Sequence, residues 1–99
     1  GALRRTELMV GIEYGASVAT ARRVILDILA RDPRIADTPA PLVMVKELGD
    51  NAVVLKILFW AKYADMFMTG PDILEKIYNE LPKKKVGFPF PQVDVHIKK

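Results

Sequence analysis

The chain has no cysteine and a single histidine, His96. Without cysteine there is no disulfide, thiolate zinc site or cysteine nucleophile, and one histidine cannot form the clusters that many metal sites require. His96 lies in a short alternating segment, where we expect it to be an exposed surface residue. The sequence therefore predicts no metal site and no cofactor.

The motifs of catalysis and of nucleotide binding are missing as well. Ser17 is not surrounded by the Gly-x-Ser-x-Gly pattern of a nucleophile elbow, and Gly11 and Gly15 do not belong to a phosphate-binding loop. The stretch "LKILFWAK" carries aromatic side chains, but not the glycines that RNA-binding domains combine with them. We predict no catalytic residue and no nucleic-acid partner.

No apolar run reaches the length of a membrane span. The most apolar window is "NAVVLKILFWAKYADMFM". Lys56, Lys62 and Asp65 interrupt it, whereas a spanning helix needs about 20 apolar residues. No signal peptide opens the chain. The initial Gly1-Ala2 is compatible with a cloning remnant, so we expect a soluble fragment of something longer.

What is present indicates one small folded domain. Of the 99 residues, 51% are hydrophobic and 27% are charged, which is ordinary for a globular protein. The formal charge is +3. The run Lys83–Lys85 alone accounts for an excess of that size, and Lys98 and Lys99 add to it. The basic character is therefore local, unlike the basic stripe of a nucleic-acid-binding face.

Alternation and capping predict a strand followed by a helix. In "ELMVGIEY", residues 7–14, apolar side chains alternate as in a half-buried strand. Ser17 is a natural N-cap, because its hydroxyl can accept a bond from an unpaired N–H of the first helical turn. Apolar residues then recur at helical spacing until Asp32, where Pro33 disfavours further helix.

The next two segments, "LVMVKEL" and "AVVLKILFWAK", are predicted to form the strands of a hairpin. The turn contains Gly49, Asp50 and Asn51, residue types that readily adopt the positive φ angles of tight hairpins. The two faces of the second strand differ. One carries Val53, Leu55, Ile57 and Phe59, and the other carries Val54, Lys56, Leu58, Trp60 and Lys62.

A second helix is predicted to end at Pro82 and to direct four apolar residues toward a core: Ile73, Leu74, Ile77 and Leu81. Two starts are open. Either Gly70-Pro71 begins the helix, with Pro71 at the first position, where its missing N–H costs nothing. Or Asp65 caps an earlier start, and Pro71 kinks the helix.

The order strand, helix, strand, strand, helix, strand predicts an α+β fold of the ferredoxin-like class, a split βαβ (βαββαβ) sandwich. Both helices then cover one face of the sheet and leave the other open. The open face would carry Val54, Leu58 and Trp60 among lysines. We weigh equally a contact surface and the alternative that Trp60 folds back against the loops.

Three stretches of the chain point to a family. They are "VGIEYGASVATARRVILDILARDPRI", "VKELGDNAVVLKILFWAK" and "FPFPQVDVHI". Together they resemble the C-terminal cytoplasmic domain of the small-conductance mechanosensitive (MscS-like) channel family, in the same order and spacing over nearly the whole chain. The third is the most specific, because Pro-Phe-Pro-Gln before an alternating strand is an unusual combination.

Two regions depart from the family pattern. Gly70-Pro71 falls where the family usually runs an unbroken helix. Lys85 stands where the family turns at a glycine, and Gly87 comes two residues later. The second helix and its exit loop are therefore the part of the chain to which the resemblance says least.

The resemblance implies a cage and assembly domain of a channel, not an enzyme. Members are homo-heptamers in the bacterial inner membrane, and their pore helices lie upstream of this domain. Their cytoplasmic parts form a hollow cage with side portals. The channel opens under membrane tension and releases ions and osmolytes. This chain would be the lower cage wall, on the cytoplasmic side of the membrane.

The resemblance also implies partners for the last strand. In the family, the final strands of the subunits form a small parallel β-barrel, in which both edges of every strand are paired. We therefore predict a cage domain over residues 1–90 and a barrel-forming strand over residues 91–99. In this strand Val93, Val95 and Ile97 are predicted to point into the barrel lumen, and Asp94, His96 and Lys98 to point outward. The predicted oligomer contacts are Pro89, Phe90, Pro91, Gln92, Val93, Val95 and Ile97.

Two other classes of function stay open on the residues alone. A soluble ferredoxin-like regulatory module that binds a small ligand at a strand edge would be a monomer or dimer, and its ligand would raise the Tm. A metabolic enzyme of the same fold is disfavoured, because the chain is poor in histidine and carries no catalytic cluster.

Overall fold

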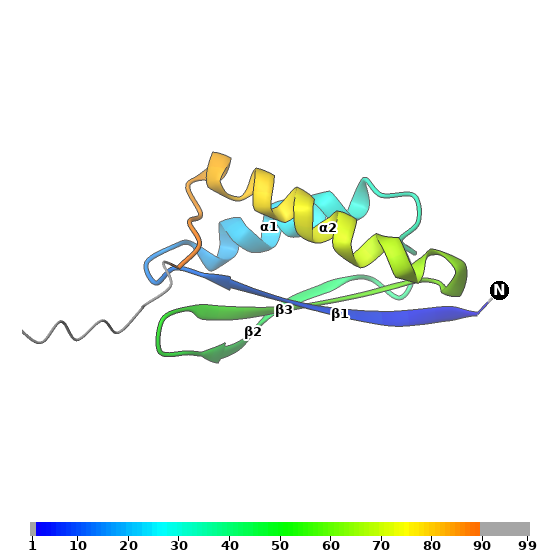
Figure 1. Ribbon diagram of the computed structural model, residues 1–99, viewed down its shortest axis with the longest axis horizontal. Coiled ribbons are helices and arrows are strands. Elements are labelled where there is room, and N and C mark those ends of the chain that lie inside the picture. The colour runs from blue at the N-terminus through cyan, green and yellow to red at the C-terminus, as the bar shows by residue number, and fades with distance from the viewer. Residues whose placement is uncertain (1, 90–99) are drawn as a thin grey trace, which may run out of the picture.

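A computed structural model describes residues 2–89 (Figure 1). One antiparallel sheet contains β1 (Leu3–Ile12), β2 (Leu42–Leu48) and β3 (Val53–Lys62), in the order β1-β3-β2. The helices α1 (Val18–Ala30) and α2 (Met66–Glu80) both cover one face of this sheet. This α+β arrangement is the predicted one, and the fourth strand of the βαββαβ order falls outside the described residues.

The first helix begins and ends where the sequence predicts. The backbone N–H of Thr20 donates to the Ser17 hydroxyl at 3.1 Å, which confirms Ser17 as the N-cap. The helix ends two residues before Asp32, in line with the restriction that Pro33 imposes. Its buried face packs on the sheet and consists of Ala21, Val24, Ile25, Ile28 and Leu29.

The core lies between the helices and the sheet. The central strand β3 turns Leu55, Ile57 and Phe59 toward the helices, and all three are fully buried. The predicted division of β3 into two faces is confirmed, because Val54, Lys56 and Trp60 on the alternate face keep partial exposure. Because β3 has a neighbour on each side, its side chains are the best enclosed in the sheet.

The first strand is shifted relative to the prediction. It starts at Leu3, four residues before the predicted start, because Leu3 lies opposite Lys62 at the far end of β3. It ends at Ile12, so Tyr14 lies beyond the strand, and its hydroxyl donates a hydrogen bond to the carbonyl of Gly49. Pairing with a long partner strand extended β1 through Arg4 and Arg5, where alternation gives no signal.

The hairpin between β2 and β3 does not use the predicted positive φ angles. No residue from Gly49 to Asn51 has a positive φ; in the described part of the chain only Gly15 and Lys85 do. The N–H of Gly49 donates to the carbonyl of Ala52 at 2.8 Å and closes a four-residue loop. Loops of this length accommodate ordinary backbone angles, so the tight-turn interpretation was wrong.

The second helix follows the earlier of the two predicted starts. It begins at Met66, after a short 3-10 turn over Tyr63–Asp65, and continues through Pro71. Asp65 occupies the N-cap position, but its side chain makes no capping bond. Ile73, Ile77 and Leu81 are buried as predicted, whereas Leu74 is 39% exposed. The core prediction for Leu74 was therefore wrong, because the helix presents that side chain to its outer flank.

The exit from α2 makes a sharp turn. A 3-10 turn over Pro82–Lys84 follows the helix, and Lys85 then adopts φ 66°. This left-handed conformation favours glycine, and Lys85 stands at the position where the family resemblance expects a glycine. Neither described helix has the length and apolarity to cross a membrane.

Candidate functional site

The predicted site begins where the chain leaves the domain. The N–H of Val86 donates to the carbonyl of Leu81 at 3.1 Å, and both side chains are buried. The N–H of Glu13 donates to the carbonyl of Gly87 at 2.9 Å. A Cβ on Gly87 would lie 2.6 Å from a carboxylate oxygen of Glu13, so the Glu13 side chain lies directly against this glycine. The exit segment is therefore held against the end of β1.

Two further contacts, one of Phe88 and one of Pro89, hold the exit segment against the domain. The ring of Phe88 stacks on that of Tyr78, with centroids 6.1 Å apart and planes 15° apart. Pro89 is half-buried, and its ring lies 3.8 Å from where a Cβ of Gly11 would be. Because Gly11 is on the face of β1 away from the helices, the chain has turned toward the open face of the sheet by Pro89.

Of the predicted oligomer contacts, only Pro89 lies within the described residues. The others fall outside them and stay predictions: Phe90, Pro91, Gln92, Val93, Val95 and Ile97. The proposed boundary between residues 1–90 and 91–99 likewise stays a prediction.

The open face of the sheet is more enclosed than its sequence suggests. Leu58 is 8% exposed, and Val54 and Trp60 are half-buried. The strand register places Glu7 and Leu42 on either side of Leu58. A contact role for these residues stays a prediction.

Neighbouring strands add side chains to this face that a single-strand pattern could not reveal. Met9 and Leu42 are 42% and 48% exposed there. The ammonium of Lys56 lies 2.9 Å from the carboxylate of Glu7 and lowers the pKa of Glu7. The open face is therefore a mixture of apolar side chains and one ion pair.

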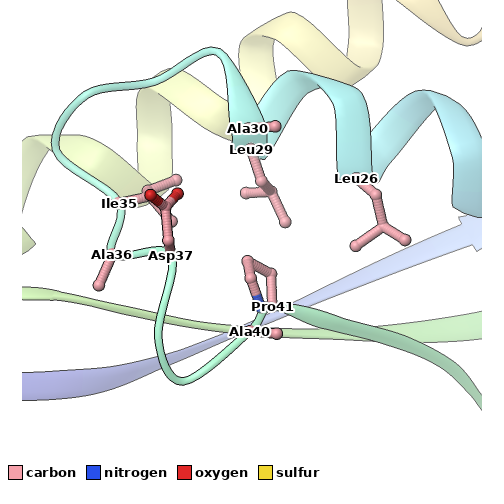
Figure 2. Close-up of a pocket in the computed structure, with 8 residues that line it drawn as sticks. All are labelled: Leu26, Leu29, Ala30, Ile35, Ala36, Asp37, Ala40 and Pro41. Atoms are coloured by element: carbon pink, nitrogen blue, oxygen red, sulfur yellow. The ribbon is translucent and has the colours of Figure 1, made fainter.

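A small cavity lies beneath the end of α1 (Figure 2). Leu26 and Leu29 extend from the helix toward Pro41, and the loop that carries Asp37 closes the other side. Its volume is about 270 Å³, slightly below the usual range of about 300–1,000 Å³ for ligand pockets. Its one carboxylate, on Asp37, is exposed to solvent. Nothing in this lining favours the ligand-binding alternative.

A charged cluster next to this loop was not found by sequence reasoning. Asp32 is 3% exposed, and it accepts hydrogen bonds from the backbone and guanidinium of Arg34 at 2.7–3.0 Å. Arg34 also pairs with Asp72 on α2 at 2.8 Å. The motif Asp32-Pro33-Arg34 could be read in the sequence. The second partner of Arg34 is Asp72 on α2, which is 38 residues away along the chain. The cluster ties the loop after α1 to the middle of α2.

The cluster shifts the protonation of its members. Hydrogen bonds from Arg34 lower the pKa of Asp32 below its ordinary value of about 3.8, although burial opposes the shift. The two carboxylates in turn raise the pKa of Arg34. Within residues 2–89, no three acidic or histidine side chains gather as they would around a metal ion. The hydrogen bonds and ion pairs of the cluster make it an internal clamp between the loop after α1 and α2.

We expect the domain to lose stability as the pH falls below about 4. The pKa of Asp32 is lower in the folded than in the unfolded chain, so its contribution is complete above the ordinary pKa. It disappears as the pH falls through the folded value. Tm measured from about pH 6 to about pH 2 should fall less in Asp32→Asn than in the wild type. Equal slopes in the two proteins would contradict this assignment.

Comparisons with known proteins all point to one family of ion channels. The family model described as "Mechanosensitive ion channel MscS, C-terminal" matches residues 6–88. The small-conductance mechanosensitive channel of Edwardsiella ictaluri is 30% identical over 94 residues, which are 95% of this chain and 33% of that protein. An uncharacterized MscS family protein of Archaeoglobus fulgidus is 35% identical over 89 residues, 90% of this chain and 31% of that protein.

A solved structure has the same fold. The crystal structure of Helicobacter pylori MscS in its closed state matches with a TM-score of 0.86 and 26% sequence identity, over 100% of this chain and 40% of that one. The chain spans about a third of the length of the curated relatives that it matches.

Proposed function

Because the chain belongs to the MscS family of mechanosensitive ion channels, whose C-terminal domain it matches, we propose that it is the cage and assembly domain of such a channel. The channel opens under membrane tension and releases ions and osmolytes. The observation that carries the proposal is the family match over residues 6–88, supported by the shared fold with a TM-score of 0.86.

In this proposal the domain has a structural role: it forms part of a cage wall and contacts other copies of itself. It lies on the cytoplasmic side of the membrane, forms the lower wall of a hollow cage and contributes no catalytic group. The conducting helices belong to the longer protein. The cage assembles from seven copies. A cage wall needs rigidity and lateral contacts, and the internal clamp of Asp32, Arg34 and Asp72 supports rigidity at one end of the helix layer.

The terminal strand, residues 91–99, joins the copies at the base of the cage. A ring of identical strands pairs both edges of each strand, which a lone strand cannot do. Pro91 lacks an N–H donor but stands at the first strand position, where this is tolerated. The attachment of Val86–Pro89 to β1 supports a defined exit direction. Val93, Val95 and Ile97 point into the lumen, and Asp94, His96 and Lys98 point outward.

The channel role is tested in the full-length protein that carries this domain. Reconstituted in liposome patches, it should pass current that suction activates. Cells that rely on it should survive a sudden drop in external osmolarity better than cells without it. A full-length protein that inserts in the bilayer and passes no stretch-activated current would refute the proposal.

Deletion of Pro91–Lys99 is expected to weaken self-association without unfolding the domain. The described core lies within residues 2–89, so the circular dichroism spectrum and Tm should hardly change. Multi-angle light scattering over a range of concentrations should show the wild type above the 11.1 kDa of one chain. The shortened chain should need at least about tenfold higher concentration to associate.

Point variants on the two faces of this strand provide the matched control. Val95→Asp places a carboxylate inside a narrow apolar lumen, which is costly, and it should reproduce the effect of the deletion. His96→Asp changes the outward face and should leave association unchanged. Equal effects of both variants would contradict the predicted orientation, and no effect of either would remove the barrel from the proposal.

A further inference from the structure

The outer edge of β1 is open within the described part of the chain. The strand pairs with β3 along its whole length, Leu3–Ile12, and no strand of residues 2–89 lies on its other side. In a complete ferredoxin-like sheet the fourth strand lies there. Unpaired N–H and C=O groups on such an edge readily bond to a nearby extended segment, so an open edge of ten residues calls for a structural reason.

The hydrogen bonds of β3 show which residues of β1 face this edge. On the side of β3 away from β1, the N–H of Ala36 donates to the carbonyl of Trp60 at 2.8 Å. Successive residues of a strand direct their N–H and C=O to opposite sides, so the odd-numbered residues of β3 face β1. The register joins them to even-numbered residues of β1. The odd-numbered residues of β1, from Leu3 to Gly11, therefore direct these groups to the outer edge.

The exit segment makes the first bond with this edge and thereby sets a register. The N–H of Glu13, one residue past β1, donates to the carbonyl of Gly87 at 2.9 Å. Because the segment reaches the sheet at the end of β1 (Figure 1), continued pairing would be antiparallel, with each further residue opposite the preceding residue of β1. Pro89 fits this register, since its ring lies 3.8 Å from where a Cβ of Gly11 would be.

Two prolines fall on positions where this pairing needs an N–H donor. In the register set by Gly87, Pro89 would stand opposite Gly11 and Pro91 opposite Met9, and both of these β1 residues direct their carbonyls outward. Proline has no N–H, so neither carbonyl would receive a bond. Proline is tolerated in a sheet where its nitrogen faces solvent, not where it faces a neighbouring strand. The first two positions of a fourth strand are therefore each missing a hydrogen bond.

The same register turns the alternating apolar residues to the open face of the sheet. Directly opposed residues of an antiparallel pair have their side chains on the same face. Val93 would lie opposite Glu7 and Val95 opposite Arg5, whose side chains are exposed. The carboxylate of Glu7 already lies 2.9 Å from the ammonium of Lys56 there. The valines would therefore lie beside charged groups and gain little burial.

Asp94 would lie on the other face, which the helices cover. It would stand opposite Thr6, whose hydroxyl is buried and has no hydrogen-bond partner in the described part of the chain. That hydroxyl supplies one bond, whereas a carboxylate taken out of water needs several bonds or a cationic partner. Arg4 is the cation on this face of β1, and its guanidinium lies over Tyr63, 5.6 Å from the ring centroid. The position is therefore unfavourable for Asp94.

The exit segment thus combines two obstacles to a fourth strand. We propose that Pro89 and Pro91, together with the register set by Glu13 and Gly87, keep residues 91–99 from completing the sheet of their own domain. A slip of one residue would correct the faces, but it would break the bond between Glu13 and Gly87. The obstacles act within one chain, so they do not depend on the proposed assembly. They leave both the terminal strand and the β1 edge free for a partner.

Four forms of the chain separate the two obstacles. They are the wild type, Pro89→Ala with Pro91→Ala, a deletion of Gln92, and the combination of all three changes. The alanines restore the two missing donors, and the deletion moves Val93 and the alternate residues after it to the helix-covered face. Amide hydrogen exchange measured by NMR follows the N–H groups of Glu7 and Met9, which face the edge.

Only the combined form should close the sheet. Its Glu7 and Met9 amides should exchange at least about tenfold more slowly than those of the wild type. A nuclear Overhauser effect should also connect Met9 with residue 91. Isotopically labelled chain is diluted into an excess of unlabelled chain, so that every contact observed lies within one chain.

Three results would overturn the inference. One is a contact of Met9 with residue 91 in the wild type. Another is closure with only the alanines or only the deletion, because the remaining obstacle would then be too weak to matter. The third is wild-type exchange rates in the combined form. If the combined form does not fold, Pro91→Ala with the deletion keeps the contact of Pro89 with Gly11 and is measured in its place.

The outcome is distinguishable from that of the proposed function. If the β1 edge of the wild type is open but only the 11.1 kDa chain is found at every concentration, this inference stands and the self-association of the domain fails. If the wild type self-associates and also shows the contact of Met9 with residue 91 within one chain, the inference fails and the self-association stands.

Discussion

Replacing Phe59 by alanine is expected to lower the free energy of unfolding by about 3–5 kcal/mol. Phe59 is fully buried on the central strand, beneath both helices. Its removal takes away the largest side chain of the core and leaves a cavity that rigid neighbours cannot fill. A small domain has about 5–15 kcal/mol of stability in total. Urea unfolding followed by circular dichroism should show a much lower midpoint.

Phe67→Ala makes the same chemical change at the surface and serves as the control. Phe67 is 86% exposed, so we expect the free energy of unfolding of the isolated chain to change by less than about 0.5 kcal/mol. A loss as large as that of Phe59→Ala would mean that the helix α2 buries a different face from the one described. The pair therefore tests the orientation of the helix as well as the core.

Arg34→Met is expected to lower the free energy of unfolding by about 2–3 kcal/mol near neutral pH. It leaves Asp32, whose side chain is 2% exposed, as a buried carboxylate without its guanidinium partner. Breaking a buried ion pair usually costs more than this, but the Arg34 side chain is 29% exposed and partly solvated, which reduces the effect. Thermal and urea unfolding measure the loss.

Arg31→Met is the matched control for this clamp. Arg31 also pairs with two carboxylates, Asp27 and Glu80, but its side chain is 55% exposed. Exposed pairs contribute little, so its Tm should stay close to that of the wild type. The difference between Arg34→Met and the wild type should also shrink as the pH falls below about 4 and Asp32 becomes protonated. A difference that persists there would assign the effect of Arg34 to packing instead of charge.

Much of the fold was encoded in short windows of sequence. Ser17 and Pro33 define α1 because capping and the restriction before proline act within a few residues. The alternation from Val53 to Phe59 identified the buried face of β3, since period-two burial is a local property of a strand. The family resemblance drew on the same local stretches, and the match over residues 6–88 confirms it.

The site was less predictable, because its members come together only through long-range pairing. Met9 and Leu42 share a face with Leu58 by virtue of the register of β1 and β2 against β3. Asp72 reaches Arg34 across 38 residues. No pattern within a single element contains either relation.

The sequence by itself determined the order of the helices and strands within residues 2–89, the burial pattern of β3, the start of α1 and the family. The tertiary structure decided that β1 begins at Leu3, that the hairpin keeps ordinary φ angles, and that Leu74 lies on an outer flank. The physical reason is the same in each case. Local propensity decides which residues form a helix or strand, but the neighbours present in the folded chain decide which of several apolar lines on that element is buried.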